Sequence, residues 1–174
     1  IVQKSLEKRL DLIAVCDHNT CENAGAVMRE GRRRGLAVLP GLEICSREEV
    51  HILAIFGDLE DALAMQAWIY SGLTGQNQPE VFGYQIVSNE DSEVLGENPR
   101  LLIGATAFGL GDIVRRTHAL NGLSLGAHVD RPAYGIINQL GFIPSDLPLD
   151  GVEVSYRTVL SKARETLPVI GTRP

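Results

Sequence analysis

The sequence predicts an α/β protein in which short strands alternate with helices around a parallel sheet. Apolar runs of strand length recur along the chain, and stretches with the apolar spacing of helices separate most of them. The runs are apolar along most of their length, which is typical of strands that are covered on both faces. Alternation of this kind is the pattern of βαβ units.

Each element has a local signal. Gly35 and the pair Asn121-Gly122 end helices, and Pro40-Gly41 is expected to interrupt a strand region. The expected strands are residues 12–16, 36–39, 42–45, 50–56, 123–127, 151–154 and 167–170. The expected helices are residues 1–9, 22–34, 59–70, 111–120, 133–140 and 156–165.

One stretch departs from the alternation. Residues 72–98 are irregular and rich in Gly, Asn, Gln and Glu. Within them, residues 84–87 and 93–95 are expected to form a hairpin around the turn at residues 88–91. We interpret this stretch as an insertion into a single domain of residues 1–174.

Composition excludes several classes of protein. The 174 residues carry a formal charge of −6, so a broad electrostatic surface for nucleic acid is not expected. Three cysteines without paired spacing argue against a disulfide framework and fit a reducing cytoplasm. No apolar run approaches the roughly 20 residues of a membrane span, so no membrane partner is expected.

Candidate ligands gather where the apolar strands begin or end. His18 and His128 each follow an apolar run, His51 lies early in another, and Glu43 lies in the strand after Gly41. In α/β folds, functional residues collect at the carboxyl ends of the strands. Neutral imidazoles together with a carboxylate suit Zn²⁺, Mn²⁺ or Fe²⁺.

Three motifs carry a family resemblance. The stretches LIAVCDHNT, PGLEICSREEVHILAIF and GLSLGAHVDRP resemble successive motifs of the PHP (polymerase and histidinol phosphatase) family. The resemblance implies a distorted seven-stranded (β/α) barrel, two to three divalent metal ions and hydrolysis of phosphate esters. It also implies that His18 binds one metal, that Glu43 bridges two others, and that His51 and His128 complete one of those sites. Asp17 would be a carboxylate that orients the ligands.

The chain also departs from the family pattern. The resemblance places a His-x-His strand before Ile1 and an Asp-x-His pair after residue 170, and neither motif occurs in the sequence. We therefore expect a partial barrel that lacks its first strand and its C-terminal end. A chain that began at Ile1 would leave an open seam, and we would expect it to associate or to be poorly soluble.

Arg131 marks a further departure, since the family usually has Pro directly after Ala-His. This side chain follows His128 on the same loop and could hold a phosphate through two hydrogen bonds. A pairing of Arg131 with Asp130 or Asp146 is an equally good interpretation. We treat Asp17 and Arg131 as candidate catalytic residues.

Other polar residues have simpler interpretations. His118 is expected to be a surface or helix-packing residue, and Asn19 and Thr20 to cap the following helix. The run Arg32 to Arg34 suits the last turn of a helix, where cations complement the dipole. Small core residues are the preferred interpretation of the three cysteines, which are Cys16, Cys21 and Cys45.

Together these features predict a metal-dependent phosphoesterase that acts on a small phosphorylated substrate, a nucleotide or a nucleic-acid end. Two alternatives remain. The domain could be a structural or regulatory module with an incomplete site, or a related metal-dependent hydrolase that cleaves another bond. The sequence does not name the oligomeric state.

Overall fold

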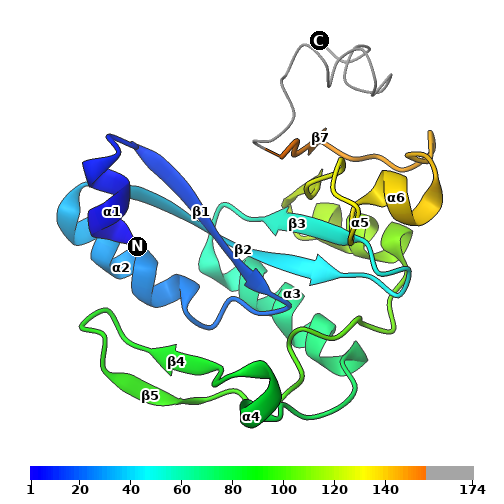
Figure 1. Ribbon diagram of the computed structural model, residues 1–174. Coiled ribbons are helices and arrows are strands. Elements are labelled where there is room, and N and C mark those ends of the chain that lie inside the picture. The colour runs from blue at the N-terminus through cyan, green and yellow to red at the C-terminus, as the bar shows by residue number, and fades with distance from the viewer. Residues whose placement is uncertain (156–174) are drawn as a thin grey trace.

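The computed structural model describes residues 1–155 and shows a mixed α/β fold (Figure 1). The expected helix at residues 156–165 and strand at 167–170 lie outside the described residues. The main sheet has the order β1-β2-β3-β6-β7. Its strands are β1 (Leu12–His18), β2 (Ala37–Cys45), β3 (His51–Ile55), β6 (Leu123–Gly126) and β7 (Gly151–Val152). The helices outside the insertion are α1 (Val2–Glu7), α2 (Ala24–Arg34), α3 (Leu59–Gly72), α5 (Leu110–Ala119) and α6 (Ile136–Leu140).

The sheet is not purely parallel, so that expectation was wrong for one strand. β1 pairs with β2, and β6 with β7, in parallel, whereas β3 runs antiparallel to both β2 and β6. Only residues 46–50 join β2 to β3. A parallel connection needs a crossover of a dozen or more residues, so a link this short forces the chain to return antiparallel.

Pro40 and Gly41 do not interrupt a strand, contrary to expectation. Both lie within β2, where Pro40 pairs in register with Val15 and Gly41 with Cys16 of β1. A Cβ atom at Gly41 would lie 2.6 Å from the Cys16 sulfur and 2.7 Å from the Ala54 carbonyl oxygen. Glycine is therefore what allows β1 and β3 to approach β2 here.

Within residues 1–155 the sheet stays open, with β1 and β7 at its two ends. The described part thus has five strands in the main sheet, and closure into a seven-stranded barrel stays a prediction. None of the described helices is long and apolar enough to cross a membrane.

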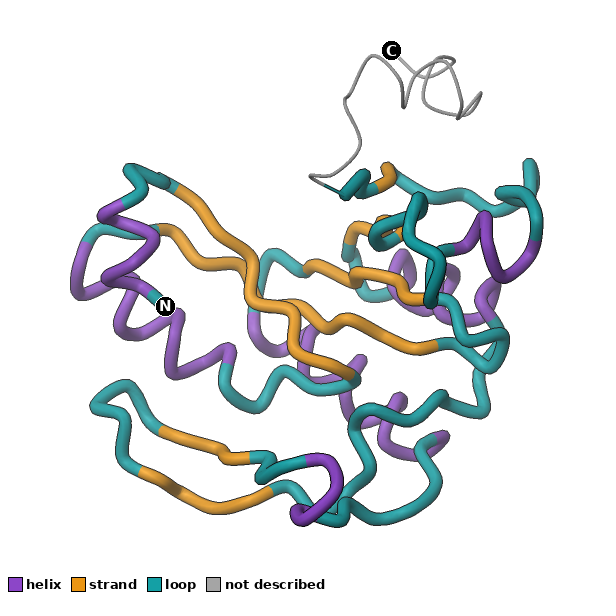
Figure 2. The backbone as a smooth tube through the Cα atoms, viewed as in Figure 1, coloured by secondary structure: helices purple, strands orange, loops and turns teal. Residues whose placement is uncertain are grey.

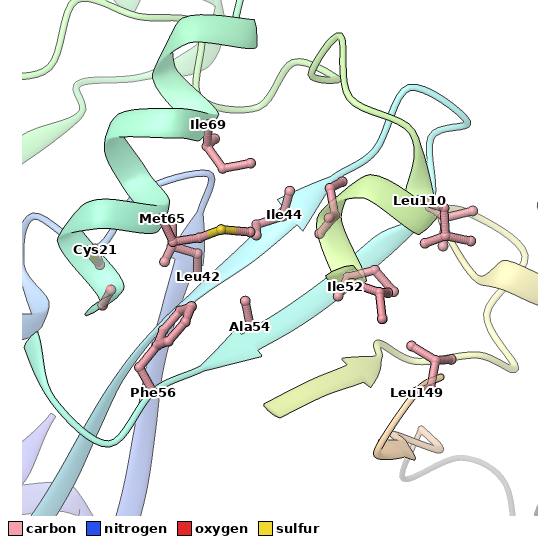
Figure 3. Packing of buried hydrophobic residues seen from close by; sticks show 14 of the residues in the cluster. Cys21, Leu42, Ile44, Ile52, Ala54, Phe56, Met65, Ile69, Leu110 and Leu149 are labelled. Carbon is pink, nitrogen blue, oxygen red and sulfur yellow. The ribbon is translucent and has the colours of Figure 1, made fainter. Parts of the chain in front are cut away.

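The hydrophobic core lies between the sheet and the helices α3 and α5 (Figure 3). Leu42 and Ile44 of β2 are fully buried and point toward Met65 of α3, whereas the fully buried Ile52 of β3 lies beside α5, the helix that carries Leu110. Successive side chains of a strand point to opposite faces of a sheet. Glu43 is therefore directed to the face opposite α3.

The insertion forms a hairpin beside α2, as Figure 2 shows. The short helix α4 (Pro79–Phe82) precedes β4 (Ile86–Ser88), which pairs antiparallel with β5 (Val94–Glu97). Ion pairs tie the hairpin turn to α2, among them Arg29 Nε to Glu90 Oε2 at 2.9 Å. The expected hairpin is present. β4 begins two residues later than expected, and β5 begins one residue later.

Asn19 does not cap α2 but joins three parts of the fold. It is fully buried with φ 54°, and its Nδ2 donates to the carbonyl oxygens of Leu102 and Gly104, both at 2.8 Å. Its Oδ1 accepts the backbone N–H of Cys45 at 3.1 Å. The N-cap of α2 is Asn23, whose side chain makes no capping bond.

Asn19→Ala is expected to lower the free energy of unfolding by about 3–5 kcal/mol, because three backbone groups, two buried and one half-buried, lose their partner. Denaturant unfolding measures the change. Asn121→Ala is the matched control, since Asn121 also has φ 54° but is exposed. Equal losses in the two variants would assign the effect to backbone strain and contradict the role of the hydrogen bonds.

Candidate metal centre

Four strands of the sheet deliver four side chains to one edge. His18 is the last residue of β1 and pairs in register with Glu43 of β2. His51 is the first residue of β3, and His128 lies two residues after β6. Because β3 runs antiparallel to its neighbours, its first residue lies at the edge where β1, β2 and β6 end. The structure thus brings together all four residues that the sequence proposed as metal ligands.

The polar atoms of three of them form a close triangle. Glu43 Oε1 lies 3.2 Å from His51 Nδ1 and 3.2 Å from His128 Nε2. The two ring nitrogens are 3.3 Å apart. Both histidines are buried, each with 6% of its surface exposed. Such an arrangement leaves the three lone-pair atoms facing one another.

This triangle fits a metal ion. Ligand atoms around a tetrahedral Zn²⁺ with bonds of about 2.0–2.1 Å lie about 3.3–3.4 Å apart, close to the observed edges. A third histidine adds to the set, since Glu43 Oε2 lies 3.6 Å from His18 Nε2. Ligand atoms of His18, Glu43 and His51 all lie within 4.8 Å of one another. The two oxygens of Glu43 therefore face different histidines, as a bridging carboxylate does.

The electrostatics of the cluster favour the forms that bind metals. Burial by itself raises the pKa of the Glu43 carboxyl, but the hydrogen bond with His51 and the charges of the three histidines outweigh it and lower that pKa. Burial is also the main reason why the pKa of His18 is lowered, against the opposing attraction of Glu43. A carboxylate beside a neutral imidazole is the combination that a divalent ion requires.

The loop that carries His128 has an unusual backbone. His128 itself has φ 27°, and its N–H donates to Glu153 Oε2 at 2.8 Å, which anchors the turn to the end of β7. Gly135 lies beneath the loop, where a Cβ atom would come 2.6 Å from the Arg131 carbonyl oxygen and 3.0 Å from that of His128. Only a residue without a side chain lets the loop close in this way.

Tyr134 fixes His51 from two sides. The two rings stack with centroids 4.4 Å apart and an interplanar angle of 8°. The Tyr134 carbonyl oxygen also accepts the backbone N–H of His51 at 3.0 Å. The ring orientation of a ligand histidine determines where its nitrogen points, so Tyr134 supports the geometry of the triangle.

The cluster opens into a cavity of about 760 Å³ that Arg131 also lines. Within residues 1–155 the Arg131 guanidinium makes no ion pair. Both carboxylate oxygens of Asp130 instead accept hydrogen bonds from Ser155, from its N–H at 2.8 Å and its Oγ at 2.7 Å. These contacts tie the loop to the residues after β7.

Asp17 is not part of this cluster. It precedes His18 on β1, and it lines a second cavity, of about 430 Å³, between β1, α2 and the hairpin. Burial raises the pKa of its carboxyl. Asp17 thus lines this second cavity and not the one at the cluster, and its expected roles in orienting the ligands and in catalysis stay predictions.

The remaining residues have structural roles. His118 on α5 lies outside the cluster, and its Nε2 is 2.8 Å from Asp150 Oδ2. Cys16, Cys21 and Cys45 are free thiols, and burial is the main cause that raises their pKa to about 12, 12 and 11. Arg32 to Arg34 form the last turn of α2, which Gly35 ends with φ 78°.

Three residues around the site were not predicted from the sequence. Tyr134 was assigned to a helix at residues 133–140, but α6 begins only at Ile136 and Tyr134 belongs to the loop. Gly135 was the available signal, since glycine before a helix often marks its start. Ile103, which lines the cavity, and Glu153, which accepts from His128, have no local pattern that indicates their positions.

Comparisons with known proteins identify the fold. No protein-family model matches the sequence, and no curated protein matches it. Among solved structures, a protein of Bifidobacterium adolescentis described as a metal-dependent phosphoesterase is similar with a TM-score of 0.63 and 18% identity, over 99% of this chain and 76% of that one.

Two further structures resemble the chain. An amidohydrolase from Chromobacterium violaceum, solved with bound sulfate and no metal, has a TM-score of 0.59 and 17% identity over 95% of this chain and 74% of its own. The lesion-specific endonuclease EndoQ of Pyrococcus furiosus has a TM-score of 0.58 and 13% identity over 86% of this chain and 35% of its own. The chain thus shares its α/β fold with a phosphoesterase, an amidohydrolase and an endonuclease.

Proposed function

We propose that this chain is a metal-dependent phosphoesterase of the PHP type. The observation that carries the proposal is the triangle of Glu43, His51 and His128, which opens into the cavity that Arg131 lines. The similar structures support a hydrolase, and two of them are described as enzymes that cleave phosphate esters or nucleic acid.

Each residue has a distinct task in this proposal. Glu43 Oε1, His51 Nδ1 and His128 Nε2 would hold one divalent ion. Glu43 Oε2 and His18 Nε2 would contribute to a second, in place of the separate ion that the family resemblance implies for His18. A divalent ion supplies Lewis acidity toward a phosphoryl oxygen and makes a nearby water molecule more acidic. Arg131 would bind the non-bridging oxygens of the phosphate and orient it toward the cluster.

The ligand atoms of the cluster limit which metals the site would bind. Three imidazole nitrogens and a carboxylate suit Mn²⁺, Zn²⁺ or Fe²⁺ better than Ca²⁺ or Mg²⁺, which prefer oxygen ligands. The substrate in this proposal is a small phosphate ester, a nucleotide or a nucleic-acid end. Metal ions would offset the charge of −6 that otherwise repels such anions.

Metal removal tests the proposal. Protein treated with a chelator is expected to lose hydrolysis of an aryl phosphate, and added Mn²⁺, Zn²⁺ or Fe²⁺ is expected to restore it, because Glu43 and the three histidines would act by holding the ions. Elemental analysis of the reloaded protein should find at least one ion for each chain. Initial rates before and after reloading give the size of the effect.

Two outcomes would contradict the proposal in different ways. Protein that binds metal but leaves every phosphate ester intact would favour a hydrolase of another bond, and an anilide or ester substrate would then be tested. Protein that binds no metal would favour the structural module.

A further inference from the structure

Two large apolar side chains lie exposed in the cavity beside the metal ligands. Ile103 has 51% and Tyr134 39% of its surface accessible, and both line the same cavity as His51, His128 and Arg131. Ligand cavities combine apolar walls with a few polar groups that fix orientation. The histidines, Glu43 and Arg131 of this cavity have roles in the proposed function, whereas its apolar wall has none so far.

The position of Ile103 is fixed by its neighbours. The Asn19 side chain donates to the carbonyl oxygens on both sides of Ile103, those of Leu102 and Gly104. The Gly104 N–H also donates to the Leu101 carbonyl oxygen at 3.0 Å. Leu102 is buried with 7% of its surface exposed. The Leu102 side chain is therefore buried, while the next side chain, Ile103, is held in the cavity.

Tyr134 is held just as firmly. Its ring stacks on His51, its carbonyl oxygen accepts from the same residue, and its φ is 59°. Its apolar surface in the cavity is therefore preorganised, as is that of Ile103, and little conformational entropy is lost when a ligand covers either of them.

We propose that Ile103 and Tyr134 form an apolar subsite that binds the organic group of the phosphate ester. This inference rests on the proposed function, because it takes the phosphate to lie at the metal ligands and Arg131. The substrate then carries an apolar group next to the phosphate, and the two walls select such esters over those of small polar alcohols such as glycerol.

Alkylphosphonates separate the subsite from the chemistry, because they carry a phosphate-like head and no leaving group. Calorimetry would measure the affinity of the Mn²⁺-loaded protein for methyl-, ethyl-, propyl- and butylphosphonate. Each added methylene is expected to tighten binding by about two- to fourfold, as burial of apolar surface predicts. Ile103→Ala should flatten this dependence, so that butylphosphonate binds little better than methylphosphonate.

Two further variants sharpen the test. Ile103→Thr keeps the branching at Cβ but replaces the ethyl group with a hydroxyl group, and it should flatten the dependence as well. Leu123→Ala is the matched control, since Leu123 is 53% exposed but begins β6, at the opposite end from His128. The control should keep the full dependence on chain length.

The outcomes distinguish this inference from the proposed function. If methylphosphonate binds and longer chains bind no better, the apolar subsite is overturned and the phosphoesterase stands. If Ile103→Ala and Leu123→Ala flatten the dependence equally, the subsite is also overturned. If no phosphonate binds to the metal-loaded protein, the proposed function fails together with the subsite.

Discussion

Glu43→Gln is expected to reduce both metal binding and phosphoester turnover by at least about 100-fold. Mutation of a residue that only hydrogen-bonds to a metal ligand costs about 10–100-fold, and the loss of a ligand itself should cost more. Glu43 lies within 3.6 Å of a nitrogen on each of the three histidines. Glutamine keeps the size of the side chain but removes the charge and replaces one oxygen with an NH₂ group. That group donates hydrogen bonds and cannot bridge two ions.

The measurements are metal content by elemental analysis and kcat/KM on an aryl phosphate. Glu97→Gln is the matched control, since Glu97 is an exposed carboxylate of β5 outside the cavity. Thermal unfolding of the metal-free proteins separates a ligand effect from a folding defect. A Glu43→Gln protein that kept its metal and its turnover would contradict the bridging role.

Arg131→Ala is expected to lower kcat/KM for an aryl phosphate about 30-fold. This corresponds to about 2 kcal/mol of activation free energy, the effect of losing a charge-assisted hydrogen bond. Arg131 lines the cavity, and its guanidinium forms no ion pair within residues 1–155. In the proposed mechanism this group binds the substrate phosphate. Metal content should not change, because arginine is not a ligand.

Arg131→Lys should recover only part of the rate, since an ammonium group cannot make the two parallel hydrogen bonds of a guanidinium. Steady-state kinetics with added Mn²⁺ measures both variants. Arg32→Ala, an exposed change in the last turn of α2, controls for the loss of one positive charge. An unchanged kcat/KM in Arg131→Ala would remove this residue from the proposed mechanism.

The positions of the candidate ligands could be predicted because the sequence marks the strand ends clearly. Apolar runs stop at Asp17-His18 and before His128, and residues at the ends of neighbouring strands meet at one edge of a sheet. The same reasoning could have corrected one error, since a five-residue link before His51 already excludes a parallel return. Alternation along a strand also puts Asp17 and His18 on opposite faces of the sheet.

Other features depend on contacts that no local pattern encodes. The stack of Tyr134 on His51 requires a loop with positive φ at residues 128 and 134, and bulky residues adopt that backbone only when the surrounding structure imposes it. Ile103 enters the cavity because Asn19, 84 positions earlier, holds its neighbours. Such positions follow from the assembled fold and not from sequence spacing.

The antiparallel direction of β3 limits where the chain can gain or lose residues. His51 starts β3, and its backbone groups bond on both sides, its N–H to the Tyr134 carbonyl and its carbonyl to the Ala127 N–H. One residue added or removed within β3 would turn every later side chain to the other face and exchange the cavity wall for the core. Lengthening the turn at residues 89–93, which lies far from this strand in Figure 1, would change no contact of the cluster. Natural variation in length should therefore concentrate in the hairpin and spare the segment from β2 to β3.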